Sequence, residues 1–120
     1  MTKNIAEFDM ESWRITEIDM KTEFFLFAST VYLLNNEIMV IGGLNNAIED
    51  KPSFSDHVIK ITCNNDGTHT ENEYNISKLP HMIRPRGCMA SLYHEDYVYV
   101  FGGVNYDDSK IILWIIFLLI

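Results

Sequence analysis

Short runs of apolar and β-branched residues alternate with polar turns along most of the chain, which predicts strands rather than helices. Residues 27–34 and 57–62 are two such runs, and Asn64-Asn65-Asp66-Gly67 after the second run is a turn signal. No segment before the C-terminal tail keeps a helical period of apolar positions over several turns. The pattern predicts an all-β chain of short antiparallel strands.

The same series of elements occurs twice along the chain. Residues 38–43, Ile-Met-Val-Ile-Gly-Gly, return as residues 98–103, Val-Tyr-Val-Phe-Gly-Gly. An apolar segment (27–34 or 87–93) and then a short polar turn precede each copy. This internal repeat predicts two similar structural units.

Each copy also carries an aromatic residue and then a methionine upstream of its double glycine. Trp13 and Met20 stand before the first copy, and Tyr74 and Met82 before the second. We expect four strands in a unit: the strand after the methionine, the Gly-Gly strand, a strand at 57–62 and the strand with the aromatic residue. Four-stranded units with a period of roughly 50 residues are typical of β-propeller blades.

Physical roles follow for the glycines and the aromatic residues. Gly42-Gly43 and Gly102-Gly103 end strands, where glycine alone tolerates a positive φ or a close backbone approach. We expect Trp13 and Tyr74 to pack between neighbouring units, because one blade is too small to hold its own core.

Together these residues resemble the kelch repeat family, whose pattern runs from an aromatic residue through Met and Arg to a strand that ends in Gly-Gly. The second unit matches the family pattern at Tyr74, Leu79, Met82, Arg86, Ala90, Gly102 and Gly103. The first unit matches it at Trp13, Ile18, Met20, Ala28, Gly42 and Gly43, but has no Arg between Met20 and Ala28. The resemblance implies an incomplete kelch β-propeller of about two four-stranded antiparallel blades.

The resemblance also divides the chain. Residues 1–20, with Phe8-Asp9 near their middle, are expected to end a preceding kelch unit, 21–76 to form blade 1, and 77–109 to form part of blade 2. Propellers close with ~4–8 blades, so we expect a truncated fragment of a longer protein. Residues 110–120 form a tail that is almost wholly apolar, and we expect a frameshift product there. The alternatives are a buried or self-associating strand and a weak membrane-surface contact.

Charge and composition exclude several classes of protein. Seventeen acidic residues against nine Lys and Arg give a net charge of −8, which disfavours nucleic-acid binding. The first residues lack the apolar core of a signal peptide, and the apolar tail is too short to span a membrane as a helix. With only Cys63 and Cys88 as cysteines, we expect a cytoplasmic protein in a reducing compartment.

Candidate chemistry is sparse. His57 with Cys63, or His81 with Cys88, suggests zinc, but no C-x-x-C or H-x-x-x-H spacing accompanies them, so we expect no metal and no cofactor. No serine or cysteine lies in a nucleophile elbow, and we expect no enzyme activity. A kelch-bladed oxidase of the galactose oxidase type would need copper ligands from several blades, and the chain has no suitable set of Tyr and His.

The leading hypothesis is a non-catalytic protein–protein interaction module, because the loops of a rigid ring can vary to fit a partner. Candidate contact residues are Arg84, before the second apolar strand, and Asn45 and Asn46, after the first double glycine. Arg86 occupies the family's arginine position and is expected to make a structural hydrogen bond or ion pair.

Resemblance to BTB-kelch proteins implies substrate recognition for a cullin-based ubiquitin ligase, although the sequence has no BTB-like helical region. The Ile-, Asn- and Lys-rich composition is similar to that of poxvirus kelch-like proteins. That similarity implies a viral protein in the host cytoplasm with a host protein as its partner. The alternative is a decayed gene remnant without independent activity.

Overall fold

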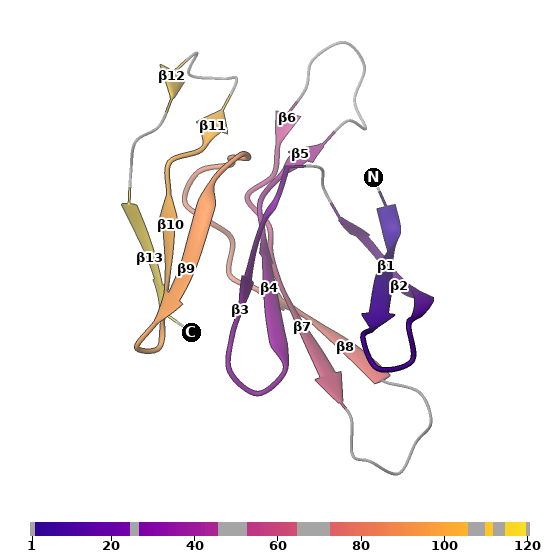
Figure 1. Cartoon of the computed structure of the whole chain (residues 1–120). Helices are drawn as coiled ribbons and strands as arrows, with labels where there is room; N and C mark the ends of the chain where they lie inside the picture. Colours follow the sequence, from indigo (N-terminus) through magenta and orange to yellow (C-terminus); the bar gives the residue numbers. More distant parts are fainter. Residues whose placement is uncertain are drawn as a thin grey trace.

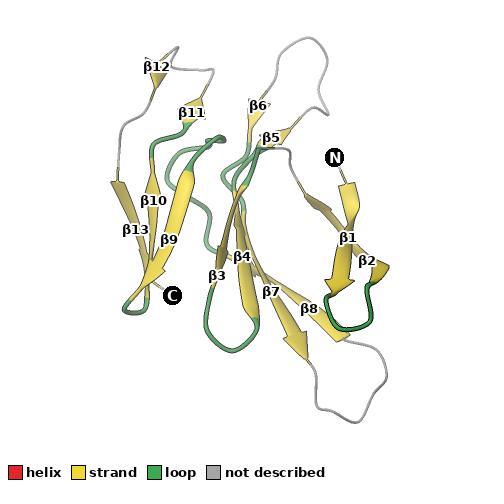
Figure 2. Ribbon diagram, viewed as in Figure 1, coloured by secondary structure: helices red, strands yellow, loops and turns green. Residues whose placement is uncertain are grey.

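The computed structural model describes residues 2–24, 27–45, 53–64, 73–105, 110–111 and 115–119. These segments hold strands and loops and no helix (Figure 2), in agreement with the predicted all-β class. Accordingly, this part of the chain contains no helix that could cross a membrane.

The strands are β1 (Thr2–Asp9), β2 (Arg14–Phe24), β3 (Ser29–Tyr32), β4 (Glu37–Ile41), β5 (Leu44–Asn45), β6 (Ser53–Phe54), β7 (Val58–Asn64), β8 (Glu73–Leu79), β9 (Ala90–His94), β10 (Tyr97–Phe101), β11 (Val104–Asn105), β12 (Lys110–Ile111) and β13 (Ile115–Leu119).

The middle of the molecule is a four-stranded antiparallel sheet in the order β3-β4-β7-β8 (Figure 1). Its register pairs Ile41 of β4 with Val58 of β7, and Val58 in turn with Leu79 of β8. These are the four strands that the sequence predicts for the first unit. The sheet is open, and none of the sheets formed by the described strands closes into a ring or barrel.

The second unit repeats the first, element by element. A three-stranded sheet has the order β9-β10-β13, so β9, β10 and β13 correspond to β3, β4 and β7. The short ladders β5-β6 and β11-β12 each follow one of the double glycines, and both lie at the same end of the molecule (Figure 1). The repeat found in the sequence is therefore a repeat of structure as well.

The apolar tail supplies a strand of this second sheet. β13 pairs antiparallel with the whole of β10, from Phe101 opposite Ile115 to Tyr97 opposite Leu119. This is the place that β7 takes beside β4, so residues 115–119 of the tail continue the repeat as a strand. β2 also continues past residue 20, and β8 past residue 76, so neither expected unit boundary falls at the end of a strand.

The core lies on both faces of the central sheet. On one face Met39, Ile41 and Val58 pack with Val98 and Val100 of β10. On the other face a second cluster holds Val40, Ile59 and Ile61, with Ile18 of β2 packed against it. The β1-β2 hairpin and the β9-β10-β13 sheet thus cover opposite faces of the central sheet. Each small sheet stabilises its neighbour by burying apolar surface that it could not bury alone.

The first strands of the two units lie next to each other. The hydroxyl oxygens of Ser29 on β3 and Ser91 on β9 are 2.6 Å apart, and the Ser91 hydroxyl also donates to the Thr30 carbonyl at 3.3 Å. These bonds connect β3, an edge strand of the central sheet, to β9, an edge strand of the three-stranded sheet.

We expect a double-mutant cycle of Ser29→Ala and Ser91→Ala to show a coupling free energy of about 1 kcal/mol in urea unfolding, because each hydroxyl is the other's partner. Ser77 lies exposed on β8 and provides the control. Ser29→Ala and Ser77→Ala should be additive. Additivity in the Ser29/Ser91 pair would contradict the observed placement of β3 beside β9.

Candidate functional site

The two double glycines meet around Arg86 at one end of the sheets. The Gly43 amide donates to the Arg86 carbonyl at 2.9 Å, and the Arg86 amide donates to the Ser55 carbonyl at 3.1 Å. The φ angles of Gly42 and Gly102 are 61° and 68°, which confirms the expected need for glycine. The junction fixes the start of the second unit on the end of the first.

Arg86 is almost completely buried, with 1% of its surface exposed. Its Nη1 donates to the Gly102 carbonyl at 3.1 Å, which is the structural hydrogen bond expected of this position. Its Nε has no hydrogen-bond partner in the described part of the chain. Burial lowers the pKa of Arg86, and the charge of Arg84 lowers it further. The side chain therefore holds the junction together while its charge is poorly solvated.

The two aromatic residues singled out by the repeat have different surroundings. Tyr74 is half-buried against the Ile59 and Ile61 cluster, and its hydroxyl donates to the Glu7 carboxylate of β1, so it lies between the central sheet and the β1-β2 hairpin. For Trp13 the expectation is wrong, because its side chain is 78% exposed and stands in the turn before β2 with a φ of 57°. Its ring contacts Phe8 edge-on, with the centroids 5.8 Å apart.

The turn around Trp13 explains its position. The Asp9 carboxylate accepts hydrogen bonds from the Glu11 amide at 2.9 Å and from the Ser12 hydroxyl at 2.6 Å. These bonds lower the pKa of Asp9 and close the turn, so that Trp13 is its last residue, directly before β2. Of the methionines in the pattern, Met82 is in the core with 3% exposure, and Met20 lies within β2.

The predicted contact residues lie at the junction end of the molecule. Arg84 is exposed in the loop between β8 and β9, and Ile83 beside it is 89% exposed. Asn45 ends β5 and pairs with Ser53 of β6, whereas Asn46 lies outside the described residues. Because Ser55 follows β6 and contacts Arg86 through the backbone, the loop with Arg84 runs beside the base of the β5-β6 ladder.

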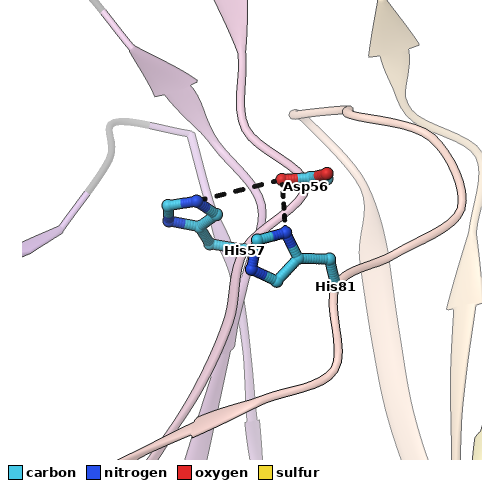
Figure 3. A group of neighbouring side chains, drawn as sticks. All are labelled: Asp56, His57 and His81. Atoms are coloured by element: carbon cyan, nitrogen blue, oxygen red, sulfur yellow. Dashed lines mark ion pairs between the residues drawn. The ribbon is translucent and has the colours of Figure 1, made fainter.

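A polar cluster that the sequence analysis does not predict lies at the same end: Asp56, His57 and His81. One side-chain ligand atom from each lies within 4.8 Å of the other two. Asp56 Oδ1 is 3.2 Å from His81 Nδ1 and 3.9 Å from His57 Nε2. Figure 3 shows the carboxylate next to both imidazole rings, whose centroids are 4.7 Å apart. Two nitrogen donors and one oxygen donor therefore converge on one small region.

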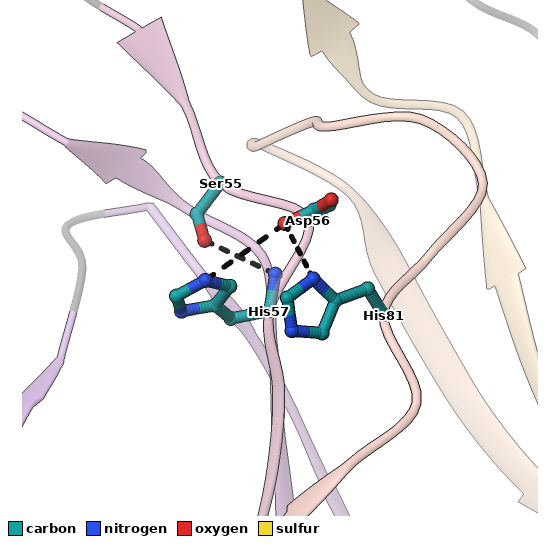
Figure 4. Close-up of polar contacts among 4 residues, drawn as sticks. All are labelled: Ser55, Asp56, His57 and His81. Carbon is teal, nitrogen blue, oxygen red and sulfur yellow. Dashed lines mark hydrogen bonds and ion pairs between the residues drawn. The ribbon is translucent and has the colours of Figure 1, made fainter.

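The backbone holds this cluster in place. The Met82 amide donates to the Asp56 carbonyl at 2.8 Å, and the Gly42 amide donates to the His57 carbonyl at 2.8 Å. The Ser55 hydroxyl accepts from the His57 amide at 3.1 Å, as Figure 4 shows. These hydrogen bonds hold the backbone of Asp56 and His57 in place beside the junction.

The register of β7 and β8 explains why spacing along the chain did not reveal the cluster. The last pair of their ladder is Val58 with Leu79, so His57 and His81 stand just beyond it on facing chains. The only pairs that spacing along the chain brings together, His57 with Cys63 and His81 with Cys88, are not the ones that meet in the structure. Cys63 lies near the opposite end of β7 from His57, and Cys88 is exposed shortly before β9; both are free thiols.

In comparisons with known proteins, the chain matches no protein-family model, no curated protein and no solved structure.

Proposed function

We propose that this chain is a non-catalytic protein-interaction module of the kelch β-propeller type, and that its partner binds the loop carrying Ile83 and Arg84. The observation that supports this proposal is the placement of the exposed residues Ile83 and Arg84 in a short loop between buried Met82 and buried Arg86. Ile83 is 89% exposed, while Met82 and Arg86 on either side are 3% and 1% exposed. A loop fixed at both ends presents its tip with little freedom to lose on binding.

The chemistry of the tip suits a protein partner. Arginine is among the residues enriched at the energetically important centres of protein interfaces, and the Ile83 side chain beside Arg84 adds apolar surface that a partner can bury. An isolated Ile at such exposure would bury its surface favourably in a partner's apolar pocket. Arg84 would then pair with a carboxylate at the rim of that pocket.

The kelch part of the proposal is supported by the four-stranded order of the first unit and by the recurrence of the Gly-Gly ends in the second. By its resemblance to viral BTB-kelch adaptors, we propose a host protein as the partner, in the host cytoplasm. Recruitment of a ubiquitin ligase would be the task of a longer, BTB-containing relative.

The test is affinity capture from a host-cell lysate with the full chain, followed by binding measurements with the purified partner. We expect Ile83→Asp combined with Arg84→Glu to weaken binding by about tenfold or more, as for residues at the centre of an interface. Leu34→Asp is the matched control, because Leu34 is 60% exposed in the β3-β4 turn at the opposite end of β4. The proposal would be contradicted by an insoluble or molten chain, or by an equal loss of binding affinity in the Ile83/Arg84 variant and in the Leu34 control.

A further inference from the structure

We propose that Asp56, His57 and His81 bind a divalent transition-metal ion, with Zn²⁺ as the reference ion. Imidazole nitrogen and carboxylate oxygen are ligands that Zn²⁺, Co²⁺ and Ni²⁺ accept readily in proteins. No Cys is needed, so the site is independent of the thiol chemistry that the sequence first suggested.

The spacing of the donor atoms suits a single ion. With metal–ligand distances of ~2.0–2.2 Å, two donors of a tetrahedral site lie ~3.4 Å apart. Asp56 Oδ1 is 3.2 Å from His81 Nδ1 and 3.9 Å from His57 Nε2. All three donor atoms lie within 4.8 Å of one another, so side-chain rotations can bring them to bonding distance of one ion.

The surroundings lower the cost of ordering the ligands. Asp56 and His57 are adjacent residues, and the Met82 amide binds the Asp56 carbonyl, which fixes His81 relative to them. The Ser55 and Gly42 bonds to the His57 backbone add further restraint. A site whose backbone is already held loses little conformational entropy when the metal binds.

Charge and access also favour a cation here. The Asp56 carboxylate supplies a negative charge to a site in a protein of net charge −8. The side chains of His57, His81 and Asp56 are 49%, 56% and 35% exposed, so an ion can enter from solvent. Three protein ligands leave at least one coordination position for water. The bound ion would tie the start of β7 to the loop that carries Ile83.

The experiment titrates Zn²⁺ and Co²⁺ into the chelator-treated full chain, with calorimetry for affinity and the visible spectrum of Co²⁺ for the coordination environment. We expect one site per chain and a metal-dependent rise in the melting temperature. His81→Gln and His57→Gln should each lower the affinity by about tenfold or more, since each removes a direct ligand. His94→Gln is the control, because His94 is also exposed beside a carboxylate, 3.6 Å from Glu95.

Circular dichroism of each metal-free variant separates lost binding from lost folding. A measurement on the unchanged chain gives an independent result: paramagnetic Ni²⁺ should broaden the amide resonances of residues 55–57 and 81–82 first. Broadening centred on Cys63, Cys88 or His94, or equal affinity loss in the His94 and His81 variants, would overturn the assignment. Absence of any saturable binding would overturn it as well.

Discussion

Gly42→Ala is expected to destabilise the fold by about 3–4 kcal/mol, from a backbone penalty and from overpacking. Gly42 has a φ of 61°, a region that alanine rarely occupies. A Cβ at this position would also collide with the Arg86 carbonyl oxygen and lie 2.6 Å from the Met89 methyl and 2.9 Å from the Met82 methyl. The two methyl groups can move, but the carbonyl belongs to the hydrogen-bonded junction and cannot move freely.

Urea unfolding followed by circular dichroism measures this effect. Asn36→Ala provides the matched control, because Asn36 has a φ of 58° in the exposed β3-β4 turn. This control carries the backbone penalty without the collision and should cost about 1 kcal/mol. Equal losses in the two variants would show that close packing against Arg86 contributes nothing.

Arg86→Ala is the second large effect, with an expected loss of about 3 kcal/mol from a cavity in the junction and an unpaired Gly102 carbonyl. Arg86→Met should cost only about 1 kcal/mol, because methionine keeps most of the apolar stem. Loss of the guanidinium itself is expected to cost little, because its charge opposes folding. Burial lowers the pKa of Arg86, so its protonated form is less favourable in the folded chain than in the unfolded chain. At neutral pH the side chain is charged in both states, and its charge therefore opposes folding.

Comparison of the two Arg86 variants by urea unfolding separates packing from charge. If Arg86→Met is as destabilising as Arg86→Ala, the guanidinium contributes more through its bond to Gly102 than its burial costs. That result would contradict the expectation that the buried charge of Arg86 opposes folding.

Much of the fold is predictable from the sequence because local sequence patterns mark the strands and their ends. The apolar runs at 27–34 and 57–62 and the double glycines each reflect a local conformational demand, and all correspond to structure. The predicted turn at residues 64–67 lies, apart from Asn64, outside the described residues. The tail lacks the alternation that marks a half-buried strand. Consecutive apolar residues conflict with a blade strand only if one face of that strand is open to water. β4 shows otherwise, since Met39, Val40 and Ile41 are all buried between two layers.

The candidate site was less accessible to sequence reasoning. The loop position of Arg84 predicts a contact residue, but its neighbour in the exposed tip, Ile83, carries no local signal of exposure. The cluster of Asp56, His57 and His81 depends on the register between β7 and β8, which the sequence does not state. Trp13 and Tyr74 have similar places in the repeat, yet only Tyr74 has a sheet beside it to pack against.

The burial of both faces of the central sheet determines how the molecule comes apart. Since β4 contributes side chains to each of the two apolar clusters, opening that strand abolishes both interfaces simultaneously. In the described part of the chain, the β1-β2 hairpin and the β9-β10-β13 sheet each pack only on the central sheet. Neither of them can therefore stay folded when the central sheet unfolds. Loss of structure would proceed from the flanks inward, and the amides of β4 would be the last to exchange with solvent.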